Sequence, residues 1–176
     1  MKISLGTANF LTTYGILNTH INKKNLNDVY KYARLNNIKY LDTSFEYDKF
    51  LKVINDKEKK FLISTKIKLY DSDFTEVYAL LKKIKIIEDK ISKLNLKKFE
   101  IFMIHNFDHI KKRNHKKTFD FLYQLKAKKI TKKIGLSVYE KKSILNLDKE
   151  FLKNIDVIQA PINIFDRKFL EKKIIN

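Results

Sequence analysis

Cysteine is absent from this chain of 176 residues, which excludes a disulfide framework and thiolate chemistry. Glycine (three residues) and proline (one) are scarce, and no linker-like stretch divides the chain, so we expect one domain over residues 1–176. No apolar run approaches the ~20 residues that a membrane-spanning helix needs. The opening residues also lack the apolar segment and cleavage site of a signal peptide. These absences predict a cytoplasmic protein with no membrane partner.

Arginine is also rare, although the formal net charge is +18. Of the 38 basic residues, only Arg34, Arg113 and Arg167 are arginines, and the lysines are spread along the whole chain. Basic chains can bind nucleic acid through its phosphates, but base readout and bidentate phosphate contacts favour arginine. We therefore interpret the charge as a solvated, lysine-rich surface and expect no specific nucleic-acid partner.

Six short runs rich in β-branched and aromatic residues stand out, and several are almost continuously apolar. This is typical of parallel strands that are covered on both faces. The runs are residues 2–6, 38–43, 61–66, 99–105, 132–137 and 156–161. Between them, helical periodicity predicts helices over 24–36, 74–94, 116–129 and, more weakly, 141–147, whereas 48–58 fits a helix or a loop. The alternation predicts repeated βαβ units and a parallel sheet.

Both a (β/α)₈ barrel and an open doubly wound sheet fit this rhythm. The dinucleotide-binding form of the doubly wound sheet carries G-x-G-x-x-G after its first strand. Residues 5–15 read "LGTANFLTTYG" and lack that motif, and the chain has no P-loop.

Polar side chains close five successive predicted strands. Asp42, Lys66, His105 and Ser137 end the second to fifth, and Gln159 lies near the end of the sixth. Each residue alone is ordinary, since a strand-end Asp is often a turn former and a lone His is more often structural. Parallel strands bring such ends together, however, and in parallel barrels that end holds the active site. The joint pattern therefore indicates a site.

Tyr47, five positions after Asp42, suggests the chemistry. A phenol has a pKa near ~10 and exchanges protons poorly at neutral pH. An adjacent ammonium lowers that pKa, and a carboxylate holds the ammonium in place. Such a tyrosine can act as a general acid while an imidazole orients the oxygen. This suits carbonyl reduction, which implies a nicotinamide cofactor because no side chain supplies hydride.

Metal binding is not expected. The four histidines, at positions 20, 105, 109 and 115, form no H-E-x-x-H motif and have no obvious carboxylate partners.

With these motifs in view, the sequence resembles an aldo-keto reductase along essentially its whole length. The matching stretches are "YLDTSFEY" (40–47), "STK" (64–66), "FMIHN" (102–106), "IGLSVYE" (134–140) and "VIQAPINIFDR" (157–167), in the family's order. The opening "LGTANFLTTYGI" (5–16) and the forms "GLSVY" (135–139) and "IQAPINIFDR" (158–167) are closest to a bacterial branch associated with polysaccharide or surface-sugar biosynthesis. The fold implied is a (β/α)₈ TIM barrel.

The resemblance also implies a role for each site residue. Tyr47 would be the proton donor, Lys66 and Asp42 its tuning pair, and His105 the residue that orients the carbonyl. Ser137 and Gln159 would hydrogen-bond the nicotinamide carboxamide, and Thr7 and Asp42 would approach the nicotinamide ribose. The cofactor would be NADP(H), and the partner a small-molecule carbonyl compound (an aldehyde, ketone or sugar).

Three departures from the family pattern stand out. Asp48 follows Tyr47 where the family usually has glycine, and its carboxylate should oppose Lys66 by raising the phenol pKa. Val138 stands where many members have an asparagine for the carboxamide. A complete barrel needs ~250 residues, so we expect a partial barrel of six strands, without strands seven and eight. In the family these carry the loops that grip the cofactor phosphates, so NADP binding should be weakened or lost.

Two hypotheses remain beside the reductase. The chain could be a catalytically inactive, truncated relative that acts as an interaction module, self-associating or pairing with a complementing chain through the open edges of its first and sixth strands. The third hypothesis, binding of nucleic acid or another anionic surface, depends on the net charge alone.

Overall fold

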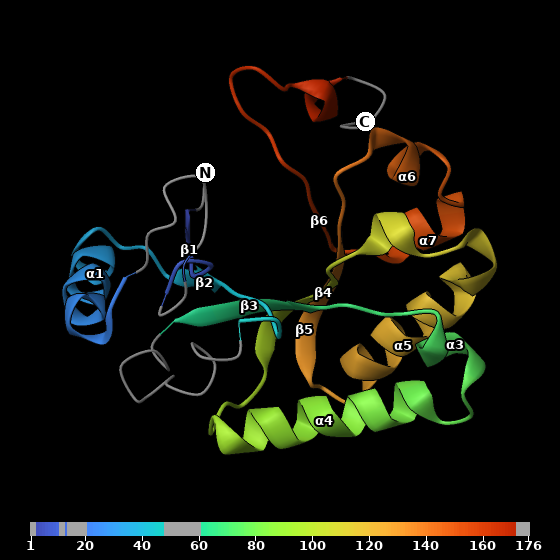
Figure 1. The fold of residues 1–176 in the computed structure, drawn as a ribbon, viewed down its shortest axis with the longest axis horizontal. Coiled ribbons are helices and arrows are strands. Elements are labelled where there is room, and N and C mark those ends of the chain that lie inside the picture. Colours follow the sequence, from blue (N-terminus) through green and yellow to red (C-terminus); the bar gives the residue numbers. More distant parts are fainter. Residues whose placement is uncertain (1–2, 11–12, 14–20, 48–60, 172–176) are drawn as a thin grey trace.

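The computed structural model describes residues 3–10, 13, 21–47 and 61–171. Within them, six parallel strands form one sheet (Figure 1). The strands are β1 (Ser4–Gly6), β2 (Tyr40–Asp42), β3 (Leu62–Ile67), β4 (Phe99–Ile104), β5 (Thr131–Ser137) and β6 (Val157–Gln159). All six predicted strands are confirmed, each inside its predicted range or one residue beyond it.

The order of the strands separates the two folds that the sequence left open. In a doubly wound sheet the strand order reverses at a central strand. Here, in the described part of the chain, each strand pairs in parallel with its neighbours in sequence. The sheet also curls, which brings the end of β6 close to the end of β2. The hydrogen bond from Gln159 Nε2 to Asp42 Oδ2 shows this closeness. The fold is a curled half-barrel of the (β/α)₈ type, as predicted.

Helices follow the strands and surround the sheet (Figure 1). They are α1 (Lys23–Leu35), α3 (Ser72–Thr75), α4 (Ala79–Lys93), α5 (His115–Ala127), α6 (Lys141–Leu145) and α7 (Lys149–Asn154), with short 3-10 helices at η2 (Phe107–His109), η3 (Lys112–Asn114) and η4 (Lys168–Leu170). The predictions of helices over 24–36 and 116–129 are confirmed by α1 and α5. The ambiguous span 48–58 lies outside the described residues.

The prediction of one helix over 74–94 is wrong. The helical backbone stops before Glu76, which is extended, and Tyr78 has a left-handed φ of 67°. The segment is therefore two helices, α3 and α4. Val77, whose spacing from the apolar residues of α4 contributed to the predicted helical period, is 73% exposed. Ile84 and Ile87 of α4 are buried as the periodicity predicts.

The weaker candidate over 141–147 forms α6, but α7 was not predicted. Phe151 of α7 stacks on Phe119 of α5, with ring centroids 4.2 Å apart and an interplanar angle of 5°. Phe119 is fully buried, so this contact fixes a short helix on the main core. A helix of six residues is too short to show a clear periodicity, and its contact with a distant residue cannot be predicted from the local sequence.

The core lies between the central strands and their helices. Phe102 and Ile104 of β4 and Leu136 of β5 are fully buried, and the Phe99 and Phe102 ring centroids are 5.8 Å apart. The outer strands differ. β1 and β6 have three residues each, and apolar side chains around them are exposed, among them Ile3, Ile158, Ile162, Ile164 and Phe165. Among the described residues, no helix combines the length and the apolar character needed to cross a bilayer.

Candidate active site

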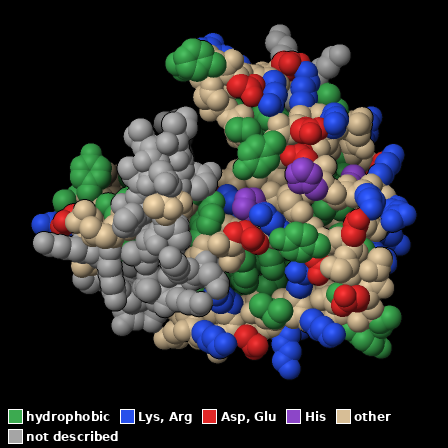
Figure 2. Space-filling model, viewed as in Figure 1, with side chains coloured by type: hydrophobic (Ala, Val, Ile, Leu, Met, Phe, Trp, Pro, Cys, Tyr) green, Lys and Arg blue, Asp and Glu red, His purple; other side chains and the backbone are tan. Residues whose placement is uncertain are grey.

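A cavity of about 260 Å³ lies at the carboxyl ends of the strands. Basic, acidic and histidine side chains lie together near the middle of the face shown in Figure 2. The cavity is lined by Ala8, Asp42, Tyr47, Lys66, His105, Ser137, Val138, Tyr139, Gln159, Ala160 and Pro161. Six of the seven predicted site residues are in that set, so the curled sheet brings them together as expected from parallel strands.

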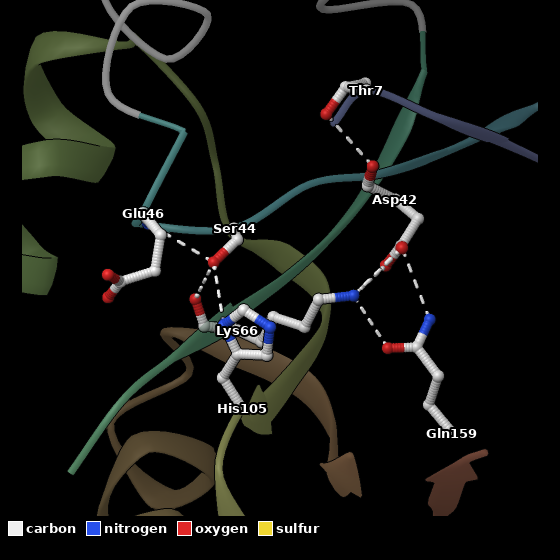
Figure 3. Close-up of polar contacts among 7 residues, drawn as sticks. All are labelled: Thr7, Asp42, Ser44, Glu46, Lys66, His105 and Gln159. Atoms are coloured by element: carbon white, nitrogen blue, oxygen red, sulfur yellow. Dashed lines mark hydrogen bonds and ion pairs between the residues drawn. The ribbon is translucent and has the colours of Figure 1, made fainter. Parts of the chain in front are cut away.

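Lys66 is at the centre of the polar network (Figure 3). Its Nζ donates to Asp42 Oδ2 at 3.0 Å, to Asp42 Oδ1 at 3.3 Å and to Gln159 Oε1 at 2.7 Å. The side chain of Lys66 is only 8% exposed, so its ammonium depends on these acceptors in place of water. Gln159 Nε2 in turn donates to Asp42 Oδ2 at 3.2 Å. The ends of β2, β3 and β6 therefore share one closed network.

The turn after β2 is held by backbone contacts to its neighbours. Thr43 N donates to Ser64 O at 2.9 Å, and Phe45 N donates to Lys66 O at 2.9 Å, so the chain runs beside β3 beyond the end of β2. Tyr47 N then donates to Ser44 O at 3.0 Å and closes a tight turn. This turn brings the half-buried Tyr47 to the cavity that Lys66 lines. Asp48, expected to oppose Lys66, lies outside the described residues.

His105 follows β4, and its backbone N donates to Ile67 O at 2.8 Å. Burial lowers the pKa of its imidazole, and the positive charges of Lys66 and Lys68 lower it further, whereas Glu46 and Asp42 act in the opposite direction. The lowered pKa favours the neutral ring. Its Nδ1 lies 3.3 Å from Ser44 Oγ.

The cofactor residues predicted on β5 and β6 are neighbours. Ser137 pairs with Gln159 in the strand register, and Val138 N donates to Gln159 O at 2.9 Å. Gly135 permits this close pairing, because a Cβ there would lie 2.5 Å from Val157 O. Val138, the departure from the family's asparagine, lines the cavity with an apolar side chain.

Thr7 is placed differently from the other six. It is fully buried, and both its N and its Oγ1 donate to Asp42 O at 3.0 Å. It thus fixes the end of β2 against β1, while Ala8 is the residue of this segment that lines the cavity. Contact between Thr7 and a nicotinamide ribose stays a prediction.

A second cavity of about 440 Å³ adjoins the first, and sequence reasoning missed it. It is lined by Lys68, Tyr70, His105, Asn106, Asp108, His109 and Tyr139, so that His105 and Tyr139 border both cavities. The Asn106 side chain bonds Leu69 N and Leu69 O, and Asp108 Oδ2 accepts from Tyr139 N at 2.5 Å. These loop residues follow separate strands, and no local motif marks them. Among the residues described, no group of three or more His, Cys, Asp or Glu side chains could hold a metal ion.

Known proteins were compared with the chain. The sequence model of the Aldo/keto reductase family matches residues 2–176. A search of curated proteins found no match. Among solved structures, the chain is similar to a putative aldo-keto reductase from Pseudomonas aeruginosa, with a TM-score of 0.72 at 17% identity over 93% of this chain and 64% of that one.

Two further structures bear on the comparison. The holo form of an aldo-keto reductase from Bacillus halodurans gives a TM-score of 0.69 at 17% identity, covering 96% of this chain and 56% of that one. An aldo-keto reductase complexed with NADPH gives 0.58 at 16% identity, covering 91% and 51%. At these identities the structures show a shared fold. The chain spans less than two-thirds of the length of each of the three.

Proposed function

Because the chain belongs to the aldo/keto reductase family, we propose that it is an NADP(H)-dependent oxidoreductase that reduces the carbonyl of a small molecule. One observation supports this above all others: Asp42, Tyr47, Lys66 and His105 line a single cavity. The substrate class is an aldehyde, a ketone or a sugar. The proposal also includes membership of the surface-sugar branch, which is supported by motif resemblance alone, and a cytoplasmic location.

The cavity fits the nicotinamide end of the cofactor. A carboxamide presents a donor and an acceptor, and the Ser137 hydroxyl and Gln159 amide each offer both. Ser137 is buried beside Gln159 on the cavity wall, next to the apolar Ala8 and Pro161. When bound, NADPH supplies the hydride. One structural neighbour is complexed with NADPH, which supports the choice of cofactor by analogy.

The chain's own residues handle the proton. Asp42 holds the Lys66 ammonium at the cavity, where its charge stabilises the phenolate of Tyr47. Tyr47 gives its proton to the substrate oxygen as negative charge develops there. Lys66 then compensates the charge left on the phenol. His105, which borders both cavities, orients the substrate carbonyl beside Tyr47.

Calorimetric titration with NADPH and an absorbance assay over a panel of aldehydes test this function. We expect heat of binding and consumption of NADPH that depends on the aldehyde. A folded protein that binds no NADPH and turns over no aldehyde would rule out activity of the chain on its own. NADPH consumption that is unchanged in Tyr47→Phe would reject Tyr47 as the proton donor.

A second candidate function is supported by the edges of the sheet. In the described chain, β1 and β6 each pair on one side only, and Ile158, Ile162 and Phe165 near β6 are exposed. Unpaired edges with apolar neighbours are templates for further strands. We propose that these edges accept strands from a second chain, either another copy or a complementing one. Sedimentation velocity over a concentration series tests this, since a monomer at every concentration that also binds NADPH argues against it.

A further inference from the structure

Lysine is concentrated in the two turns that lead into β4 and β5. Residues 93–98 and 126–133 contain eight lysines in fourteen positions, whereas 38 of the 176 residues in the whole chain are basic. Phe99 pairs with Thr131 in the strand register, and Phe99 N donates to Ile130 O at 2.9 Å, so the two turns lie side by side. All eight lysines are exposed. We call them the basic face: Lys93, Lys97, Lys98, Lys126, Lys128, Lys129, Lys132 and Lys133.

Local contacts explain half of this charge. Three lysines are held by carboxylates, in the pairs Lys126–Asp156 at 2.7 Å, Lys128–Glu88 at 2.9 Å and Lys132–Glu100 at 3.0 Å. Lys93 lies in the last turn of α4, where the helix dipole stabilises a positive charge. The other four lie beyond the two helices and make no ion pair within the described part of the chain. We call these four the lysine quartet: Lys97, Lys98, Lys129 and Lys133.

The backbone at Lys129 also shows that this residue does not serve the turn. Lys129 has a left-handed φ of 59°, and after it Ile130 N donates to Leu125 O at 3.0 Å, which closes the end of α5. Glycine is the usual residue at such a helix end, because side chains of L residues are disfavoured there. The geometry of the turn therefore gives no reason for a lysine at this position.

Exposed apolar side chains lie among the lysines. Leu62 at the start of β3 is 40% exposed, and it lines a cavity of about 360 Å³ together with Lys97 and Lys98. Ile3 is 57% exposed, and it lines a cavity of about 220 Å³ together with Lys133. A surface that combines lysines with exposed apolar groups fits the boundary between lipid headgroups and acyl chains.

We propose that the basic face attaches the protein to the surface of an anionic lipid bilayer. Negatively charged headgroups attract the lysines, and Leu62 and Ile3 enter the headgroup boundary. Attachment to a surface needs no membrane-spanning segment, which is the feature that the sequence-based expectation of no membrane partner considered. The basic face lies at the amino ends of the strands and the candidate active site at their carboxyl ends, so the site stays open to solvent. The proposal does not depend on the reductase function.

Nucleic acid also presents phosphates, but it fits this surface less well. Residues 93–98 and 126–133 contain no arginine for bidentate phosphate contacts. They also contain no aromatic residue on which a base could stack. The apolar side chains of Leu62 and Ile3 would gain nothing from a phosphate backbone. Duplex DNA is therefore the competing partner in the test.

Co-sedimentation with vesicles tests the proposal. We expect the wild type to bind vesicles of equal parts phosphatidylcholine and phosphatidylglycerol, to bind pure phosphatidylcholine poorly, and to lose affinity as the salt concentration rises. Replacing the lysine quartet by glutamine should lower the affinity for the anionic vesicles on the order of 100-fold. The matched control makes the same change in net charge at four exposed lysines elsewhere and should lose far less affinity. These are Lys82, Lys85, Lys112 and Lys116. Circular dichroism confirms that each variant is folded.

Three results would overturn the proposal. The first is a wild type that does not bind anionic vesicles at low salt. The second is an equal loss in the quartet variant and its control, because binding would then depend on net charge alone. Leu62→Ser supplies the third comparison: it should weaken binding to vesicles and leave binding to duplex DNA unchanged. Vesicle binding that Leu62→Ser does not alter would contradict the assignment of lipid as the partner.

Discussion

The centre of the sheet and its edges are built differently, and the candidate site draws on both. β3, β4 and β5 have six, six and seven residues and each pairs on both sides, whereas β1 and β6 have three residues each. Phe102 on β4 is fully buried, whereas Ile158 on β6 is 39% exposed. Lys66 and His105 extend from the well-packed centre, but Gln159 extends from an edge.

Proton transfer and cofactor binding therefore depend on different parts of the sheet. Lys66 and His105 lie on or directly after long strands, and Asp42 and Tyr47 lie on or after β2, which has three residues but pairs on both sides. Their geometry should be less sensitive than that of Gln159 to a disturbed edge. The Gln159 amide depends on a three-residue strand whose close approach requires Gly135. Cofactor binding should therefore be more sensitive than the proton-transfer machinery to changes at the edges.

The largest expected effect is at the proton donor. Tyr47→Phe removes the hydroxyl that gives up the proton, so we expect kcat to fall by ~10²–10⁴-fold with little change in NADPH affinity. Steady-state kinetics and calorimetry measure both quantities. Tyr32→Phe, on the exposed face of α1, is the control and should be silent. A fall in NADPH affinity that matches the loss of kcat would mean that Tyr47 holds the cofactor instead.

Stability should divide the centre from the edge next. Phe102→Ala opens a cavity in the core and should reduce the free energy of unfolding by ~3–5 kcal/mol. Ile158→Ala removes a partly exposed side chain from β6 and should cost less than ~1 kcal/mol. Urea denaturation of the two variants gives the comparison. Equal losses would show that β6 is as tightly packed as β4.

A smaller effect is expected at Gln159. Gln159→Leu removes both the amide offered to the carboxamide and an acceptor of Lys66, so NADPH affinity should fall on the order of 10-fold. The unfolding free energy should change less than in Phe102→Ala. Calorimetric titration measures the affinity, with Gln124→Leu on the exposed face of α5 as the control. Unchanged affinity in Gln159→Leu would remove Gln159 from the cofactor site.

The smallest effect is a pH dependence of stability. The pKa of His105 is lowered from 6.5 by burial and by Lys66 and Lys68, against Glu46 and Asp42. The unfolded chain therefore binds the proton more readily, and stability falls as the pH drops below 6.5 toward the folded-state pKa. Urea denaturation at several pH values over this range should show that the free energy of unfolding changes less with pH in His105→Gln than in the wild type.

His115 contributes in the same direction, because burial also lowers its pKa. His115→Gln should therefore also make stability depend less on pH over this range. If the free energy of unfolding depends on pH equally in the wild type and in His105→Gln, burial does not lower the pKa of His105 and this prediction is wrong.

The sequence predicts the strands well, because apolar runs are local signals. It also predicts the strand-end residues, because parallel strands bring their carboxyl ends together. It does not predict the break at Tyr78, since a left-handed tyrosine has no sequence marker of the kind glycine provides. Ser44 was also missed. "DTS" (42–44) reads as an ordinary turn, and the contact between the Ser44 hydroxyl and His105 joins residues that are 61 positions apart. The second cavity is built from loop side chains, whose convergence requires the folded sheet.

If Lys66 acts through Tyr47, the effects of removing the two side chains on kcat/KM must be coupled, and a double-mutant cycle measures that coupling. Tyr47→Phe, Lys66→Met and the double variant are compared, after urea denaturation confirms that each is folded. We expect strong non-additivity: once the phenol is gone, Lys66→Met should lower the residual rate by less than ~3-fold. If the two losses multiply, Lys66 works independently of Tyr47, and the proposed proton-transfer pair does not exist.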